Sequence, residues 1–290
     1  MAGEATERIA IHSAKGAVVE VCRHGGHVVS WKNAAGEDLI FVSKQAIFKP
    51  PKAIRGGVPV CFPQFGMMGP MTTQHGFARN VAWEVLSAEG CQATLQLCYG
   101  GTSNADFPHP FELQTVIRVG DDAAGSFEQE LKVTNTGTSP LTFTTALHTY
   151  YRVSSVADAH VSGLSGHRYL DNLKGQAEAV DHAEHVDFSG EVDRVYVAAP
   201  DSITITDGAA GRAFQITKHG FPDAVVWNPW IEKAASMADF GDEEYKDMLC
   251  IEPAVAGSGA VTLAPTETWS GCQSVLRVHV GEAGQAGAQA

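Results

Sequence analysis

The stretch Phe127-Glu128-Gln129-Glu130-Leu131-Lys132-Val133 points most directly to the fold. Its charged residues alternate with the others, so Phe127, Leu131 and Val133 fall on one face of an extended chain. A period of two is typical of an antiparallel strand that packs one face on a core and exposes the other to water. The stretch is therefore predicted to be a half-buried strand of an antiparallel sheet.

Short runs of the same kind recur along the chain on both sides of this strand. They predict further strands at residues 17–22, 94–98, 113–119, 202–206, 213–217, 260–263 and 274–280. Turn-forming residues at 121–125 and at 207–211 predict two hairpin connections. Strands separated by turn signals are typical of a large β-sandwich or barrel.

Helix signals are few. An Asn228-Pro229 pair resembles a helix start and predicts a short helix over residues 230–240, with one more turn at 242–245. Neither an internal repeat nor a long linker interrupts the chain. The sequence thus predicts one all-β domain over residues 1–280 and a disordered tail, rich in Gly, Ala and Gln, over residues 281–290.

The composition bounds the possible partners. The chain has 290 residues, and its formal net charge of -13 argues against binding to nucleic acid or to anionic membranes. A small anion remains possible, because salt screens distant charges over roughly 8 Å and a local cluster of cations can prevail. No apolar run reaches the length of ~18 residues that a membrane helix needs. The N-terminus also lacks the basic and apolar regions of a signal peptide.

The six cysteines include no C-x-x-C pair, and most of them lie in apolar runs. This pattern favours reduced thiols in a cytoplasmic protein over a disulfide scaffold or a zinc site.

Two polar residues stand inside apolar runs. Glu252 interrupts the apolar run Met248–Val255 with no basic residue beside it. His148 lies in a run rich in Thr and Tyr at residues 143–151, which is predicted to be a strand. An unpaired buried charge is costly, so each residue is expected to have a distant partner or a chemical task. Histidine titrates nearest neutral pH, which suits a general acid, although a hydrogen-bonded core histidine is the plainer reading.

Five further residues stand in stretches that plain strands do not explain. Arg55 lies in a loop dense in Gly and Pro, where the backbone can approach a ligand. Gln74, His75 and Arg79 bring an amide, an imidazole and a guanidinium together, and two guanidinium groups can hold a phosphate. Asp193 is either an acceptor for a sugar hydroxyl or a turn residue paired with its neighbour. For each of them a solvated or structural role is the alternative.

Several common motifs are missing from the chain. It has neither a P-loop, nor a G-x-G-x-x-G after a strand, nor a G-x-S-x-G elbow, which argues against the common nucleotide-binding proteins and serine hydrolases. His182 and His185 fall in a polar loop, so no metal site is predicted from them.

Seven segments taken in order resemble one family. The chain is similar to the glucose-6-phosphate 1-epimerase (hexose-6-phosphate mutarotase) family of the galactose-mutarotase-like superfamily, from about residue 25 to residue 269. The segments that carry the resemblance are Ile54-Arg55-Gly56-Gly57-Val58-Pro59, Phe62-Pro63-Gln64-Phe65-Gly66, Gln74-His75-Gly76-Phe77-Ala78-Arg79, Ala146-Leu147-His148-Thr149-Tyr150, Asp193-Arg194-Val195-Tyr196, Trp227-Asn228-Pro229-Trp230 and Ile251-Glu252-Pro253-Ala254.

The resemblance implies a β-supersandwich of large antiparallel sheets with a site in a concave face. It implies Glu252 as the general base and His148 as the general acid of a mutarotase. It implies substrate binding by Arg55, Gln74, Arg79 and Asp193, with the arginines on a phosphate, and neither a metal nor an organic cofactor. Because His75 adjoins two of these positions, we expect it in the same pocket.

The chemistry agrees with these residue types. Exchange of anomers needs one group to deprotonate the anomeric hydroxyl and another to protonate the ring oxygen. At their reference pKa values a glutamate is ionised and a histidine can be protonated near neutral pH. The predicted substrate is a small phosphosugar, D-glucose 6-phosphate, and the protein is expected to be a monomer. The alternatives are an aldose 1-epimerase acting on uncharged sugars and a non-catalytic sugar-binding module.

Overall fold

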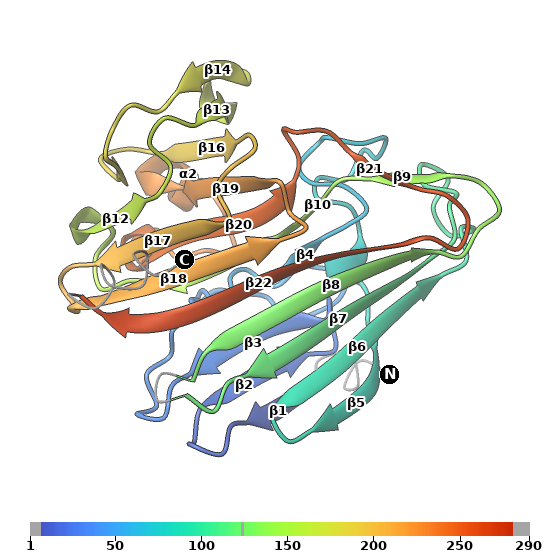
Figure 1. The fold of residues 1–290 in the computed structure, drawn as a ribbon, viewed down its shortest axis with the longest axis horizontal. Coiled ribbons are helices and arrows are strands. Elements are labelled where there is room, and N and C mark those ends of the chain that lie inside the picture. Colours follow the sequence, from blue (N-terminus) through green and yellow to red (C-terminus); the bar gives the residue numbers. More distant parts are fainter. Residues whose placement is uncertain (1–6, 123–124, 281–290) are drawn as a thin grey trace.

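The computed structural model describes residues 7–122 and 125–280. The predicted tail, residues 281–290, lies outside the described residues. Antiparallel strands dominate the described part of the chain, which confirms the predicted all-β class (Figure 1).

The largest sheet within the described residues has nine strands and follows the length of the molecule (Figure 1). In spatial order its strands are β15 (His185–Asp187), β12 (Ala159–Ser162), β17 (Ser202–Asp207), β18 (Arg212–His219), β22 (Thr268–His279), β8 (Phe127–Asn135), β7 (Phe111–Val119), β6 (Gln92–Tyr99) and β5 (Glu84–Glu89). Residues 127–133 lie in β8, in which every second residue is buried as predicted.

A second sheet of eight strands carries the polar residues singled out above. Its strands are β14 (Ala177–Val180), β13 (Arg168–Asp171), β16 (Val192–Tyr196), β19 (Asp223–Asn228), β20 (Met248–Val255), β10 (Thr145–Leu147) and β4 (Val60–Cys61), with β11 (Thr149–Arg152) also paired to β20. All eight residues of β20 are buried, so Glu252 is a carboxyl group inside the protein.

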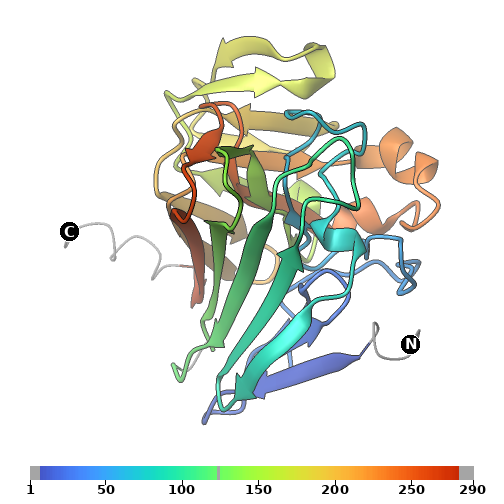
Figure 2. The same cartoon turned by 90° about the vertical axis from the view of Figure 1, so that its right-hand side faces the viewer.

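Two smaller sheets complete the strand layers. One contains β1 (Arg8–His12), β2 (Val18–Cys22) and β3 (His27–Lys32), and the other contains β21 (Val261–Leu263) and β9 (Leu141–Phe143). The β1–β3 sheet packs against the β5–β7 end of the large sheet, as the side view in Figure 2 shows. One apolar cluster, which includes Trp31, Phe127 and Phe214, fills the space between these layers.

Helices are short in the described residues. They are η1 (Ala78–Asn80), η2 (Val156–Asp158), η3 (Asn172–Lys174), α2 (Trp230–Ser236) and η4 (Glu244–Asp247). The predicted helix over 230–240 is α2, which ends earlier because Met237 is extended. Pro229 occupies the N-cap position, and the Asn228 side chain accepts a hydrogen bond from the Trp230 amide at 2.9 Å. None of these helices is long and apolar enough to cross a membrane.

The predicted strands are found, with shifted ends. β7 and β8 pair as the hairpin predicted at 121–125 requires, although residues 123 and 124 of its connection lie outside the described residues. β17 and β18 pair from Ser202 and Thr217 to Asp207 and Arg212, which confirms the hairpin predicted there. β22 begins six residues before the predicted start at Ser274. One prediction needs correction: His148 does not lie inside a strand but between β10 and β11, where its amide donates to the Pro59 carbonyl at 3.0 Å.

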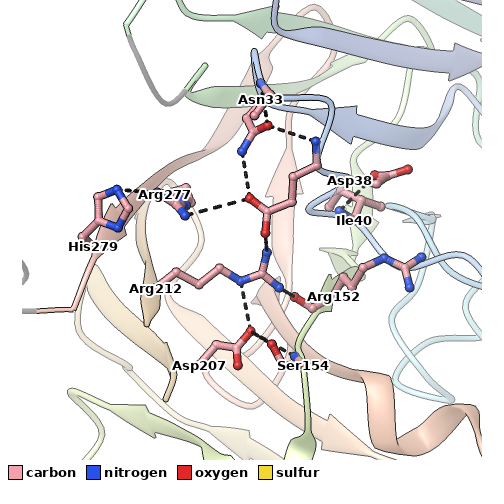
Figure 3. A network of polar contacts seen from close by, with 11 residues as sticks. Asn33, Asp38, Ile40, Arg152, Ser154, Asp207, Arg212, Arg277 and His279 are labelled. Atoms are coloured by element: carbon pink, nitrogen blue, oxygen red, sulfur yellow. Dashed lines mark hydrogen bonds and ion pairs between the residues drawn. The ribbon is translucent and has the colours of Figure 1, made fainter. Parts of the chain in front are cut away.

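A buried polar network ties the turn after β3 to the nine-stranded sheet (Figure 3). Arg212 is 3% exposed and donates to Asp207 at 3.0 Å, to the Arg152 carbonyl at 2.8 Å and to Glu37. Asp207 also accepts hydrogen bonds from the amide and hydroxyl of Ser154. Because Asp207 is fully buried, its charge depends on these partners.

Candidate active site

All seven residues singled out from the sequence line one cavity of about 520 Å³. They are Arg55, Gln74, His75, Arg79, His148, Asp193 and Glu252. The cavity lies on one face of the eight-stranded sheet, between the loops at residues 55–79, the segment around Asn172 and helix α2. The structure therefore brings together residues that are up to 197 positions apart in the chain (252 minus 55).

The register of three neighbouring strands builds the sheet side of this cavity. Asp193 on β16 faces Trp227 on β19, and Val225 on β19 faces Glu252 on β20. Directly paired residues of antiparallel strands share a face, and so do residues two apart on one strand. These four side chains therefore point to the same side of the sheet.

His148 and Glu252 form the central pair. Their atoms Nδ1 and Oε1 lie 3.3 Å apart, although not in hydrogen-bond geometry. The histidine is 7% exposed and the glutamate 1% exposed. Because Nδ1 faces the carboxyl group, the other ring nitrogen, Nε2, is the one that a sugar in the cavity can reach.

Aromatic rings fix the orientation of His148. Tyr150 stacks on the imidazole with 4.8 Å between ring centroids and 11° between planes. Trp227 and His75 meet it edge to face at 5.7 Å and 5.6 Å. With rings on several sides, the imidazole has little freedom to turn away from Glu252.

Burial changes the proton affinities of the pair. Desolvation raises the pKa of Glu252 well above its ordinary value, and the charge of Asp193 raises it further. Desolvation lowers the pKa of His148 well below its ordinary value, with further lowering by Arg79 and Arg55. The expectation that both groups keep their reference pKa values is therefore wrong for this cavity. The raised pKa of Glu252 and the lowered pKa of His148 both favour a protonated carboxyl group beside a neutral imidazole.

His75 is held in one neutral form. Its Nδ1 accepts a hydrogen bond from the Gly66 amide at 3.1 Å, so the proton of the neutral ring is on Nε2. Burial lowers the pKa of His75 well below its ordinary value, and the charge of Arg79 adds to this. His75 thus offers a fixed N–H donor in the cavity wall.

Three cationic side chains line the same cavity, namely Arg55, Arg79 and Lys233. Arg55 donates to Asp239 at 3.2 Å and to the Tyr150 hydroxyl at 3.4 Å. Arg79 donates to the Gln74 carbonyl at 3.2 Å, while its Nε is buried without a hydrogen-bond partner. The local charge is therefore positive although the whole protein is acidic, so the cavity can hold an anion.

Acceptors for hydroxyl groups line the cavity as well. Asp193 accepts a hydrogen bond from Asn172 at 2.7 Å, and desolvation raises its pKa. The exposed side chains of Gln74 and Gln176 lie at the cavity as well. A cavity with donors, acceptors, an aromatic face and cations suits a small polar anion such as a sugar phosphate.

Sequence reasoning missed several residues of the cavity. Asn172, Gln176, Lys233 and Met237 line it but were not singled out. Lys233 could have been found, because it lies on the predicted helix immediately after the Trp-Asn-Pro-Trp segment. Asn172 and Gln176 carry no such signal, since they belong to a polar loop that resembles any other.

Comparisons with known proteins agree with this geometry. The sequence profile of the family described as "Aldose 1-epimerase" matches residues 7–275. A relative from Cenchrus ciliaris is 43% identical over 274 residues, covering 91% of this chain and 83% of the relative. A relative from Escherichia coli is 36% identical over 246 residues, covering 80% of this chain and 78% of the relative. Both carry the name "Putative glucose-6-phosphate 1-epimerase".

Solved structures share the fold. The crystal structure of "a putative mutarotase (YeaD)" from Salmonella typhimurium has a TM-score of 0.81 and 28% identity, over 93% of this chain and 90% of that one. The GalM/aldose epimerase homologue from C. elegans has a TM-score of 0.75 at 12% identity, over 94% and 99% of the two chains, which shows the fold alone. The galactose-mutarotase-like fold implied by the sequence resemblance is thus confirmed. The chain belongs to the aldose 1-epimerase family of isomerases.

Proposed function

We propose that this protein interconverts the α and β anomers of D-glucose 6-phosphate. The observation that carries the proposal is the buried His148–Glu252 contact of 3.3 Å in a cavity that Arg55, Arg79 and Lys233 also line. An acid–base pair alone suits any aldose, whereas the cations add a reason for a phosphate. The names of the plant and bacterial relatives support the same substrate.

The reaction needs two proton transfers and no redox step. Glu252 takes the proton of the C1 hydroxyl, the bond between C1 and the ring oxygen breaks, and the ring oxygen keeps the electron pair and takes a proton from Nε2 of His148. The C1–C2 bond then turns, and the ring oxygen attacks the other face of the aldehyde. On closure the two residues exchange roles. Each transfer contributes roughly 10²–10⁴-fold to the rate.

The neutral pair of the free protein fits this cycle. A protonated Glu252 beside a neutral His148 has the same number of protons as an ionised Glu252 beside a protonated His148. The second arrangement opens the ring, and the first closes it. In the free protein, a neutral His148 with its ring proton on Nε2 can take the Glu252 proton on Nδ1 across the 3.3 Å contact, which gives the ionised pair. The neutral pair left after ring opening has its ring proton on Nδ1, so it closes the ring through Nε2.

A phosphate would favour the arrangement that opens the ring. The charges of Arg79 and Arg55 disfavour a proton on His148. Arg79 also favours ionised Glu252, so offsetting its charge affects both members of the pair, whereas Arg55 acts on His148 and is not among the groups that shift Glu252. A phosphate dianion paired with Arg55 offsets its charge, so the imidazolium becomes less costly. The phosphosugar is therefore expected to gain in the chemical step as well as in binding.

The remaining side chains position the sugar. We assign the Nε2–H of His75 to a sugar oxygen near the reacting carbon, since His75 adjoins His148. Asp193 accepts hydrogen bonds from ring hydroxyls, and the amide of Gln74 can accept through its oxygen and donate through its nitrogen. Correct placement of the ring contributes through proximity, because misplacement by 1 Å can cost about 10²-fold in rate.

The test is anomer exchange of glucose 6-phosphate beside free glucose, followed by saturation-transfer NMR above the uncatalysed background. Glu252→Gln keeps the shape of the side chain and removes the base, and Glu178→Gln is the control because Glu178 is an exposed carboxylate on β14. We expect wild type and Glu178→Gln to accelerate exchange of the phosphosugar, and Glu252→Gln to lose at least about 10²-fold.

Other outcomes would overturn the proposal in distinct ways. Equal acceleration of both sugars would indicate a general aldose 1-epimerase. Acceleration of neither would indicate a sugar-binding protein without catalysis. Full activity of Glu252→Gln would remove Glu252 from the mechanism.

The proposal also covers the extent of the domain, the oligomeric state and the cellular compartment. We infer one domain over residues 1–280, because one apolar cluster extends from Ile11 on β1 to Val275 on β22. We infer a cytoplasmic monomer, and the absence of disulfide bonds among the six cysteines, all of which lie in the described residues, supports a reducing compartment.

A further inference from the structure

A thiol lies behind the acid–base pair. Cys250 is on β20 two residues before Glu252, so both side chains point to the same side of the sheet. One ligand atom from each of His148, Cys250 and Glu252 lies within 4.8 Å of the others. Within the described residues, these three side chains form a group that could hold a metal ion.

These three side chains are buried and in part unpaired. His148 is 7% exposed, Glu252 1% and Cys250 0%. Nδ1 of His148 and Oε2 of Glu252 have no hydrogen-bond partner in the protein. Buried polar atoms are normally paired, so two unpaired atoms beside one thiol indicate a place where a ligand can bind.

The spacing fits a tetrahedral zinc ion. Bond lengths of about 2.0–2.2 Å to nitrogen and oxygen and about 2.3 Å to sulfur place neighbouring ligand atoms about 3.3–3.6 Å apart. The His148–Glu252 contact is already 3.3 Å. Because the three atoms lie within 4.8 Å of one another, the thiol needs to move closer by at most about 1.5 Å (4.8 minus 3.3) to reach this spacing.

The ligand set also suits zinc chemically. One imidazole, one thiolate and one carboxylate are ligands that Zn²⁺ prefers. The thiolate and the carboxylate together balance the charge of the ion, which makes its burial tolerable. Three protein ligands leave a fourth position, on the side where His148 and Glu252 line the cavity.

We propose that His148, Cys250 and Glu252 form an inhibitory site for a thiophilic divalent cation, with Zn²⁺ as its best occupant. The ion binds Nδ1 of His148, the sulfur of Cys250 and an oxygen of Glu252, and the thiol releases its proton on binding. An occupied site holds the two groups that must carry protons to and from the sugar. The ion is thus an inhibitor and not a cofactor. Inhibition rests on the proposed function, whereas binding of the ion does not.

Binding is tested with Co²⁺, which occupies zinc sites and gives a thiolate-to-metal absorption band that Zn²⁺ lacks. The variant is Cys250→Ala, and Cys61→Ala is the matched control because Cys61 is a second fully buried thiol, in one apolar cluster with Phe65 and Val225 of the cavity lining. We expect the band in wild type and in Cys61→Ala and none in Cys250→Ala. Circular dichroism establishes that both variants are folded.

Inhibition is tested by anomer exchange of glucose 6-phosphate at increasing Zn²⁺. Loss of a residue that only hydrogen-bonds a metal ligand already weakens metal affinity about 10–100-fold. Cys250→Ala removes a direct ligand, so we expect its half-inhibitory Zn²⁺ concentration to rise at least about 100-fold. Without Zn²⁺ that variant should keep the wild-type rate, because the thiol takes no part in the reaction.

The outcomes separate the two proposals. A Co²⁺ band that persists in Cys250→Ala, or no band in wild type, overturns the metal site whether or not the protein is an epimerase. A band that depends on Cys250 in a protein without epimerase activity supports the site and refutes the proposed function. Activation by Zn²⁺, or equal inhibition of wild type and Cys250→Ala, overturns the inhibitory role.

Discussion

Replacing Arg79 by glutamine should separate the recognition of phosphate from the chemistry of the sugar ring. Arg79 lines the cavity, its Nε has no hydrogen-bond partner, and Nη2 donates to the Gln74 carbonyl at 3.2 Å. Much of its donor capacity is therefore free for a ligand. Arg55 differs, because Asp239 and Tyr150 already engage its guanidinium group.

The size of the effect follows from the lost interaction. A hydrogen bond to a charged group contributes about 1.5–3 kcal/mol, and 1.36 kcal/mol corresponds to tenfold in rate. Arg79→Gln should therefore lower kcat/KM for glucose 6-phosphate about 10- to 150-fold. For free glucose no such bond is lost. Because Arg79 lowers the pKa of both His148 and Glu252, its removal favours the imidazolium but disfavours the carboxylate, and the rate with glucose should change little.

The assay is anomer exchange of both sugars by saturation-transfer NMR, with the ratio of the two kcat/KM values as the result. Arg118→Gln is the control, since Arg118 lies on β7 and pairs with Glu128 of the nine-stranded sheet. The control should leave the ratio unchanged. The ratio is informative because a general loss of folded protein would lower both rates equally.

Two results would refute the reasoning. An equal loss for both sugars would mean that Arg79 supports the fold or the shared chemistry and does not bind phosphate. An unchanged rate for glucose 6-phosphate would mean that the phosphate is held elsewhere, with Arg55 and Lys233 as the remaining cations of the cavity.

Three further predictions concern stability. Arg212→Met should lower the free energy of unfolding by about 3–5 kcal/mol in urea titration, because it leaves the fully buried Asp207 without its cation; a change below 1 kcal/mol would contradict this account. Burial lowers the pKa of His27 to about 3, so between pH 6.5 and pH 3 the unfolded chain binds a proton that the folded chain does not. The free energy of unfolding should therefore fall by roughly 4 kcal/mol as the pH drops from 6.5 to 3. Urea titrations across this range should show a shallower fall for His27→Gln. Gly57→Ala should cost at least about 2 kcal/mol in the same assay, because Gly57 has a φ of 66° and an added Cβ would lie 2.1 Å from the Val28 carbonyl oxygen; a fully stable variant would show that this backbone can shift.

Local sequence patterns predicted most of the individual strands, because burial of one face imposes a period of two that is visible in the residues themselves. β8 shows this period clearly. The first half of β22 escaped prediction because residues 268–273 lack it. The rings of Phe221 and Trp269 leave no room for a side chain at Gly271 in that half, since an added Cβ would lie 2.6 Å from each ring.

The site was predicted in part. The sequence by itself marked Glu252 and His148 as polar residues in apolar runs, and its resemblance to a family supplied roles for them. Only the tertiary structure decided that they meet, since the contact depends on β10, β11 and β20 lying side by side. It likewise brought Lys233 to the same cavity from helix α2, whose position over the site the sequence did not indicate.

The proton affinities of Glu252 and His148 separate what the sequence determines from what the tertiary structure decides. The identity of a side chain sets its reference pKa, and with it the expectation of an ionised Glu252 beside a protonated His148. The protein reverses that preference, because burial removes the water that stabilises both charges and two arginines oppose a proton on the imidazole. Sequence thus determined which groups are available and which segments become strands. Burial and charge around those groups depend on residues distant in the chain, so only the tertiary structure decided how they hold their proton.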